Sequence, residues 1–390
     1  SAGQTGGQGV SAYATRSRFV VSNYGMGGSL QSGMAESRWG GPAAALLKWE
    51  TTNQFDIGLD IAFLNNRVNL TVDAYYKKTK DLLLDKLIPM SSGFSRIQAN
   101  YGNVTNKGLE ISGHFIPVKA RNFLWSIDAN ISFNRNKVGG LDADQYSDVA
   151  WGIENMFLVR NGEPIGTLYG YVEDGFYDNE AEVRADPLYR NETDSKVKSM
   201  VGEVKYKNLD DDPVIDNRDR QIIGNTNPDY QYGITNTLEW KNWTFSFFLQ
   251  GTQGNDVLNV NLKKFDMASV DNMPYFIYNN RWTAENRANA KWPRANRTST
   301  RSMRASDRYI EDGSYLRCKN VSLSYRFRHP MKFVESINLV ASVSNLFTIS
   351  GYSWMDPDVN SFGSDPKRRG VDMASYPSAR TFNFGVQIGF

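Results

Sequence analysis

The sequence predicts an all-β fold, a transmembrane antiparallel β-barrel, and three observations lead to this prediction. The chain ends on a strand in which apolar and polar residues alternate, and its last residue is aromatic, Phe390. The same alternation recurs along the 390 residues, where short turns alternate with long polar connections. Aromatic residues make up 13% of the chain, which suits the interfacial belts of a membrane barrel.

The composition is compatible with a barrel and excludes several other classes. No segment approaches the roughly 18 consecutive apolar residues of a transmembrane helix. A barrel strand needs an apolar residue only at every second position, so a mean hydropathy of −0.50 is compatible with it. A net charge of +2 gives no sign of nucleic-acid binding, and a single cysteine excludes an internal disulfide. No signal peptide begins at Ser1, so we expect a mature or truncated envelope protein.

Apolar residues at every second position justify each strand in turn. In the first strand, Phe55, Ile57 and Leu59 share one face, and Asp56 and Asp60 share the other. The predicted strands are 55–63, 68–76, 109–115, 123–133, 232–240, 243–249, 321–327, 337–343 and 382–390, with a fainter tenth around 11–21.

The connections between these strands fall into two classes. The short ones are Asn65–Asn66, 117–122, Lys241–Asn242 and a turn near His329–Pro330. The long, polar ones are 82–103, 138–229, 252–313 and 350–379. Short periplasmic turns and long extracellular loops are typical of outer-membrane barrels, and a periplasmic C-terminus places every long loop outside. A soluble β-sandwich is the alternative, but connections beyond about 15 residues are uncommon in compact domains.

Nine or ten strands are few for a whole barrel with connections of this length. An open sheet in a bilayer would expose an unpaired strand edge to lipid. We therefore expect residues 1–390 to be one portion of a larger barrel whose remaining strands lie elsewhere.

Several segments resemble the SusC/RagA-type TonB-dependent transporters of outer membranes. They are LKWETTNQFDIGLD (47–60), AYYKKTKDLLL (74–84), NYGNVTNKGLEI (100–111), GEPIGTLYGY (162–171) and YIEDGSYLR (309–317). The run 320–327 and the closing strand continue the resemblance, which covers nearly the whole chain with the motifs in the family's order.

The resemblance implies that the chain is the C-terminal portion of a 22-stranded barrel. It also implies active import of large nutrients, either oligosaccharides or oligopeptides, and the aromatic content of the chain favours oligosaccharides. TonB–ExbB–ExbD would drive import through an N-terminal plug region, which we do not find in residues 1–390. A SusD-like surface lipoprotein would cap the loops, and outer-membrane lipid and lipopolysaccharide would surround the barrel.

Residues 208–219 match the spacing of a calcium-binding loop. The oxygen donors at the expected positions are Asn208, Asp210, Asp212, the Val214 carbonyl, Asp216 and Asp219. Two departures weaken the match, because Pro213 replaces the turn glycine and Asp219 is shorter than the usual glutamate. The alternative is an acidic loop whose carboxylates cap turns and pair with Arg218 and Arg220. We expect no required cofactor, with structural Ca²⁺ as the one metal hypothesis.

A basic run and a set of aromatic residues lie in the long loops. Eight basic residues and two acidic ones lie between Arg281 and Arg308. They could attract an anionic ligand, contact lipopolysaccharide phosphates, or form an exposed loop balanced by acidic neighbours. Aromatic rings can stack on sugars, and those named as ligand contacts are Trp151, Tyr169, Tyr171, Tyr177, Trp282, Trp292, Tyr352 and Trp354. We expect most of them to pack the loops and two or three to touch ligand.

Catalysis has little support in the sequence. It contains no Gly-x-Ser-x-Gly elbow and no His/Cys cluster, and His114 lies on the polar face of its strand. We therefore expect a protein that is not an enzyme. Besides an importer, a passive porin and a surface adhesion or structural barrel stay open.

Overall fold

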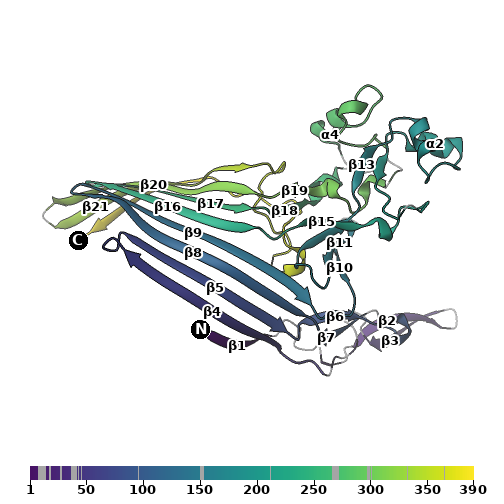
Figure 1. Cartoon of the computed structure of the whole chain (residues 1–390), viewed down its shortest axis with the longest axis horizontal. Helices are drawn as coiled ribbons and strands as arrows, with labels where there is room; N and C mark the ends of the chain where they lie inside the picture. The colour runs from purple at the N-terminus through teal and green to yellow at the C-terminus, as the bar shows by residue number, and fades with distance from the viewer. Residues whose placement is uncertain are drawn as a thin grey trace.

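The computed structural model describes the chain except residues 8–14, 17–18, 27–28, 37–41, 43, 45, 95, 150–152, 211, 266–271, 297–298, 300, 332 and 364. Ten long strands form one antiparallel sheet, and shorter elements gather at one end of it (Figure 1). In spatial order the strands are β1 (Ala2–Gly7), β4 (Glu50–Phe63), β5 (Val68–Lys80), β8 (Asn103–Ala120), β9 (Phe123–Gly139), β16 (Tyr230–Trp240), β17 (Trp243–Gln253), β20 (Tyr315–Met331), β21 (Val334–Ser350) and β23 (Thr381–Gly389).

The nine predicted strands are all present and pair in sequence order. The turn from β4 to β5 places Asn65 and Asn66 at positive φ values of 56° and 59°, where asparagine is tolerated better than most residues. Lys241 has a φ of 55° in the turn from β16 to β17. The tight turns at 65–66 and 241–242 are therefore confirmed.

The tenth strand of the sheet is β1, which pairs with β4, and Phe19–Met26 (β2) forms a separate hairpin with Ser29–Glu36 (β3). Residues 11–14 and 17–18 of the fainter strand expected around 11–21 lie outside the described residues, so that strand stays a prediction. β1 is rich in glycine and polar residues, so it shows no alternation. The link expected at 117–122 is shorter, because β8 runs to Ala120 and β9 begins at Phe123. The turn expected near 329–330 lies further along the chain, between Met331 of β20 and Val334 of β21. In both strands a register shift absorbs the proline.

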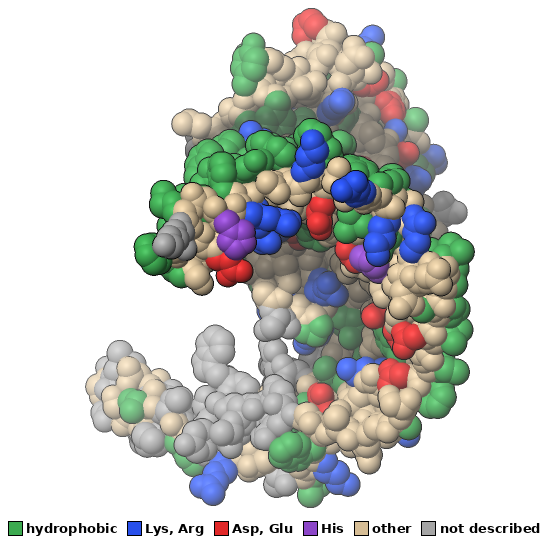
Figure 2. Space-filling model, turned by 90° about the vertical axis from the view of Figure 1, so that its left-hand side faces the viewer, with side chains coloured by type: hydrophobic (Ala, Val, Ile, Leu, Met, Phe, Trp, Pro, Cys, Tyr) green, Lys and Arg blue, Asp and Glu red, His purple; other side chains and the backbone are tan. Residues whose placement is uncertain are grey.

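The sheet is strongly curved and its two faces differ in polarity (Figure 2). Hydrophobic side chains gather on the outside of the curve, and charged and polar side chains line the hollow. On β4, Ile57 exposes 63% and Leu59 exposes 59% of their surface. We call these the outer and inner faces. An apolar outer face and a polar inner face are the pattern of a membrane barrel wall.

The long connections fold into a layer at one end of the sheet (Figure 1). We define the loop layer as residues 140–229, 254–314 and 351–380. Its strands and helices are β10 (Gln145–Val149), β11 (Ile153–Val159), β12 (Thr167–Gly170), β13 (Glu173–Phe176), α1 (Glu180–Ala185), α2 (Asp194–Met200), β14 (Val204–Tyr206), β15 (Gln221–Asn225), β18 (Asp256–Asn259), α3 (Val260–Lys264), α4 (Tyr275–Asn280), β19 (Ile310–Asp312) and β22 (Val371–Asp372). The fourth long connection forms a hairpin of β6 (Leu83–Leu87) and β7 (Arg96–Asn100).

The largest hydrophobic core lies in the loop layer. Phe157 and Leu168 from the first loop, Leu258 from the second and Val371 from the third belong to one buried cluster. β18 also pairs with β19 and β22, so the second and third loops share a small sheet. The described residues include no helix with the length and hydropathy of a membrane span.

Candidate functional site

The inner face of the sheet carries two polar cavities. One of about 590 Å³ lies over β4, β5, β8 and β9, where the Tyr75 hydroxyl hydrogen-bonds the Asn134 side-chain oxygen at 3.0 Å. The other, of about 290 Å³, extends from β5 to β17. There His114 Nδ1 and Asp128 Oδ1 are 2.7 Å apart, so His114 lies on the polar face as its alternation indicates. Together the cavities give the inner face hydrogen-bonding groups along the strands.

A third polar cavity, of about 290 Å³, lies where the sheet meets the loop layer, and we call it the mouth pocket. The sheet contributes Gln231, Thr252 and Tyr315, from the loop-side ends of β16, β17 and β20. The third loop contributes Asp358 and Arg369. Gln231 pairs with Thr252, and Thr252 pairs with Tyr315, so the three strand residues share the inner face.

A register shift in β20 brings Arg317 to this region. Asn320 pairs with Phe248, whereas Cys318 pairs with Leu249, so Lys319 is an extra residue. Because the shift reverses the alternation, Arg317 and Tyr315 turn to the inner face and Cys318 to the outer face. Strict alternation along the sequence would put Cys318 on the polar face with Asn320 and Ser322, and only the bulge reveals that Arg317 lies there instead.

Arg317 joins the sheet to the third loop. Its guanidinium binds the Asp356 carboxylate, and it also donates to the Thr348 and Ser378 hydroxyls at 3.0 Å each. Burial opposes ionisation of Asp356, but the N–H groups of Ser378 and Asp358 and the guanidinium hold its pKa below the ordinary value. Arg317 exposes only 1% of its side chain. This buried pair therefore fixes the third loop to the wall.

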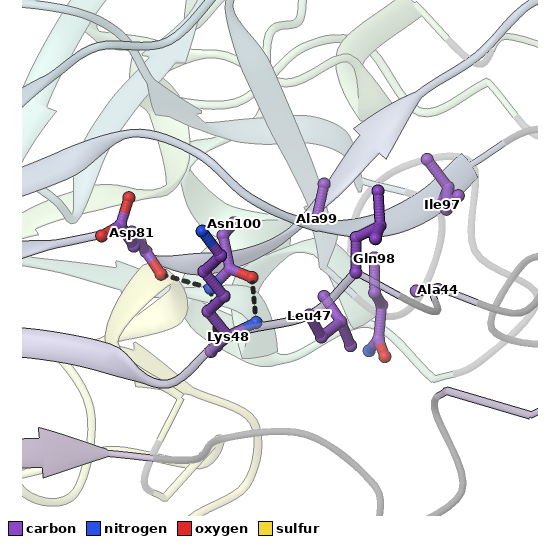
Figure 3. Close-up of a pocket in the computed structure, with 9 residues that line it drawn as sticks. Ala44, Leu47, Lys48, Asp81, Ile97, Gln98, Ala99 and Asn100 are labelled. Atoms are coloured by element: carbon purple, nitrogen blue, oxygen red, sulfur yellow. Dashed lines mark hydrogen bonds between the residues drawn. The ribbon is translucent and has the colours of Figure 1, made fainter.

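A further cavity, of about 730 Å³, lies beside the β6–β7 hairpin (Figure 3). Asn100 holds its base together, because its side-chain nitrogen donates to the carbonyls of Lys48 and Asp81 at 2.7 and 2.8 Å. Its side-chain oxygen accepts the Lys48 N–H at 2.6 Å. The remaining walls are mostly apolar, as Leu47 and Ile97 illustrate. Its polar lining residues are Lys48, Asp81, Gln98 and Asn100.

The predicted aromatic contacts are mostly interior residues of the loops. Six are buried: Tyr169, Tyr171, Tyr177, Trp282, Trp292 and Tyr352. Trp354 is half-buried, with its ring centre 6.0 Å from that of Phe265, and Trp151 lies outside the described residues. The Tyr352 hydroxyl donates to Asp372 at 2.7 Å. The structure therefore places most of this set in loop packing, and its role in ligand binding stays a prediction.

Two of these tyrosines pack against arginines. The Arg220 guanidinium lies 4.7 Å from the Tyr169 ring centre and 5.7 Å from that of Tyr171. The Arg304 guanidinium also lies 5.3 Å from the Tyr171 ring centre. A cation over an aromatic ring is stabilised by about 0.5–2 kcal/mol, with the larger values at desolvated sites. Burial also lowers the pKa of Arg220.

The same stacking continues into the predicted basic run. Arg301 lies 5.3 Å from the Tyr206 ring centre and 5.8 Å from that of Tyr189. We call this set the arginine–tyrosine ladder: Arg220, Arg301, Arg304, Tyr169, Tyr171, Tyr189 and Tyr206. Arg308 binds the buried Glu173 carboxylate through two hydrogen bonds of 2.5 and 2.6 Å. Much of the basic run is thus engaged inside the loop layer, and Arg297 lies outside the described residues.

The predicted calcium loop is organised around Arg218. Its guanidinium lies 3.1 Å from Asp210 and 3.0 Å from Asp216, and it also binds Asp212. Asp219 accepts the backbone N–H groups of Leu209 and Asp216, both at 2.8 Å.

Two further residues of this loop form hydrogen bonds within it. The Asn208 side chain donates to the Asp212 carbonyl at 2.6 Å, and the Val214 N–H donates to Asp212 Oδ1 at 2.8 Å. Among the described residues no group of three acidic, His or Cys side chains is placed to hold a metal. The carboxylates of this loop surround the Arg218 guanidinium, and Ca²⁺ binding stays a prediction.

Comparison with known proteins places this architecture in a family. Residues 10–346 match the family model described as TonB dependent receptor-like, beta-barrel. A TonB-dependent receptor of Formosa agariphila is 33% identical over 100% of this chain and 39% of its own length. The TonB-dependent receptor SusC of Bacteroides thetaiotaomicron is 29% identical over 88% of this chain and 32% of its own length.

Solved structures share the fold. The RagAB peptide transporter matches with a TM-score of 0.77 at 20% identity, over 100% of this chain and 40% of the matched chain. Its 'open-open' state matches with a TM-score of 0.75 at 21% identity. The chain spans about two fifths of the length of these relatives. The curved sheet, the two-faced strands and the match over most of the chain show that this chain belongs to the TonB-dependent receptor β-barrel family.

Proposed function

We propose that this chain forms part of the wall and loops of an outer-membrane importer of large nutrients, with oligosaccharides ahead of oligopeptides as the cargo. The observation that carries the proposal is the polar inner face beneath a folded loop layer, in a member of the TonB-dependent receptor family. A polar lumen offers hydrogen bonds to a hydroxyl-rich or amide-rich ligand. The relative described as a peptide transporter keeps oligopeptides in the proposal.

The energy source and the partners follow from the family. TonB–ExbB–ExbD drives import through a plug region outside residues 1–390, which form one unit, the C-terminal portion of the barrel. A SusD-like surface lipoprotein closes over the loop layer and traps the ligand. Neither TonB-driven import nor trapping of the ligand by the lipoprotein requires catalysis. The chain therefore acts as a transporter and not as an enzyme.

The orientation follows from the asymmetry of the connections. Long connections leave one end of the sheet and short turns leave the other, which in this family class corresponds to the extracellular and periplasmic sides. The loop layer therefore faces outward and the C-terminus lies in the periplasm. The outer face contacts lipid, and its upper rim contacts lipopolysaccharide.

Uptake by cells that carry the full-length protein tests the proposal. Labelled oligosaccharides and oligopeptides too large for porins are supplied to the wild type, to a strain lacking the protein and to a strain lacking TonB. We expect accumulation only where both the protein and TonB are present. Uptake that persists without TonB would support the passive porin, and no uptake of either cargo would support a structural barrel.

A further inference from the structure

The mouth pocket has the size and lining of a site for one residue of a longer ligand. Its volume, about 290 Å³, lies at the lower end of the roughly 300–1,000 Å³ of small-molecule sites. Thr252 and Tyr315 each expose only 9% of their surface, so the fold fixes the positions of their hydroxyl groups. Its three strand residues lie side by side on the inner face, at the end of the sheet that meets the loop layer.

One cation in this pocket is unpaired. Among the described residues, the Arg369 guanidinium has no carboxylate or hydrogen-bond partner, although it lines the cavity. Its neighbour Arg368 differs, because it binds Asp365 at 2.7 Å and stacks on Phe362 at 4.1 Å. An arginine that lines a polar cavity without a partner is suited to a carboxylate, which it can bind through two hydrogen bonds.

Two acceptors lie in the same pocket. Within the part of the chain that the structure describes, the buried Asn255 side-chain oxygen has no hydrogen-bond donor. An unpaired buried acceptor is unfavourable, so a ligand donor gains binding energy when the Asn255 side chain turns this oxygen into the pocket. Asp358 is the second acceptor, and it lies 3.5 Å from Arg317. Because Asp356 and Asp358 together balance Arg317 and Arg369, the pocket is not a general trap for anions.

We propose that the mouth pocket binds one ligand residue that carries a carboxylate together with hydroxyl or amide N–H donors. The carboxylate pairs with Arg369, and the donors reach Asn255 and Asp358. This inference rests on the proposed import function and names the chemistry of its cargo. A hexuronate residue of an acidic polysaccharide and the C-terminal residue of a peptide share this chemistry. A neutral sugar lacks the carboxylate, and an anion without donors is repelled by Asp358.

Calorimetric titration of the full-length protein in detergent tests the proposal with paired probes. These are trigalacturonate with its methyl ester, and trialanine with its C-terminal amide. We expect at least one acid to bind about tenfold more tightly than its neutral counterpart. Arg369→Gln should remove that preference. Arg287→Gln, which changes an exposed arginine elsewhere in the loop layer, should leave it intact.

A second variant tests the acceptor. Asn255→Ala should weaken the preferred acid about threefold while the preference for acid over neutral probe remains, because Arg369 is unchanged. Matching melting temperatures for the wild type and all variants would confirm that each is folded. Equal affinity for acid and neutral probes, no binding of either acid, or an unchanged preference in Arg369→Gln would overturn the proposal.

The probes also distinguish the two sources of a carboxylate, and they separate the binding proposal from the import proposal. Selective binding of trigalacturonate identifies an acidic polysaccharide as cargo, and selective binding of trialanine identifies a peptide. Calorimetry measures binding to the pocket independently of transport. A wild type that binds an acid but imports nothing would overturn the import function alone, whereas import without Arg369-dependent binding would overturn the pocket alone.

Discussion

The large sheet and the loop layer bury apolar surface in opposite ways. On β23 the outer-face residue Phe384 exposes 84% of its surface, whereas Met156 and Phe157 of the loop layer expose none. The sheet therefore depends on lipid to cover its outer face and on its hydrogen-bond ladder for internal order. The loop layer has the packed core of a water-soluble domain. One part of the chain therefore has the surface of a protein in lipid, and the other has the surface of a protein in water. The mouth pocket lies where the two parts meet.

The largest expected effect comes from breaking the joint between the two regions. Arg317→Ala leaves the buried Asp356 carboxylate without its cation, which costs about 3–5 kcal/mol. We expect the loop layer to lose protection against limited proteolysis while the circular dichroism band of the sheet is retained. Arg326→Ala, on an exposed part of the same strand, is the matched control. Unchanged proteolysis would show that the pair does not hold the loop.

The next largest effect distinguishes the two faces of the wall. Ile57→Lys places a charge on the outer face, where lipid contact makes a lysine unfavourable by about 2–4 kcal/mol near the bilayer centre. Gln54→Lys places the same charge on the inner face of the same strand and should cost little, because Gln54 lines a polar cavity. Denaturant titrations of the protein in lipid vesicles measure both. Equal losses would mean that the faces are wrongly assigned.

A smaller effect tests the packing of the loop layer. Tyr171→Leu keeps an apolar side chain but removes the ring between Arg220 and Arg304, which should cost about 1–2 kcal/mol. Tyr376→Leu is the control, since Tyr376 exposes 92% of its surface. Thermal unfolding followed by near-ultraviolet circular dichroism checks both variants. Equal melting temperatures for Tyr171→Leu and the wild type would deny the ladder a role in stability.

A still smaller effect depends on pH. Burial raises the pKa of Asp256, which accepts the Asn225 N–H at 2.7 Å. For a carboxyl with a raised pKa, the stabilising contribution is complete below its ordinary pKa of about 3.9 and is lost as the pH rises through the folded value. Asp256→Asn should therefore be more stable than the wild type at pH 7 by less than about 1 kcal/mol, and equal to it near pH 3.

The control for this pH effect is Glu180→Gln, which changes an exposed carboxyl in α1. Melting temperatures of both variants are measured from pH 3 to pH 7. A difference between Asp256→Asn and the wild type that grows as the pH falls would reverse the assigned direction.

The last prediction concerns the acidic loop at 208–219, where we expect added Ca²⁺ to have no effect on stability. Because Arg218 already lies among Asp210, Asp212 and Asp216, we expect neither Ca²⁺ nor EGTA to shift the melting temperature of the full-length protein. Arg218→Ala is the sharper version, since it leaves three carboxylates without their cation and should create a Ca²⁺ dependence. A Ca²⁺-dependent wild type would restore the metal hypothesis.

The sheet could be predicted from sequence because alternation is a local signal that reports which solvent each face meets. This signal failed at the bulge before Asn320, where the ladder departs from strict pairing, and in β1, whose glycine and polar residues do not alternate with apolar ones. The loop layer gave no such signal. Its aromatic and basic residues were recognised but assigned separate roles, because stacking between distant residues such as Arg304 and Tyr171 depends on tertiary structure.

The mouth pocket likewise could not be predicted from the sequence, because it depends on tertiary structure. Its lining comes from three strands and all three loops of the loop layer, and none of its residues forms a motif with its neighbours in sequence. Arg369 appears in the sequence only as part of a short basic run. Only the fold separates it from Arg368, which is already paired.

The core that the three loops share also limits how such a protein can diversify. Because Phe157, Leu258 and Val371 pack in one cluster, no loop can be exchanged alone without leaving gaps in the other two. We therefore expect the three loops to be inherited and recombined as a single block. An insertion into one of them, such as an epitope tag, should disturb the packing of the other two.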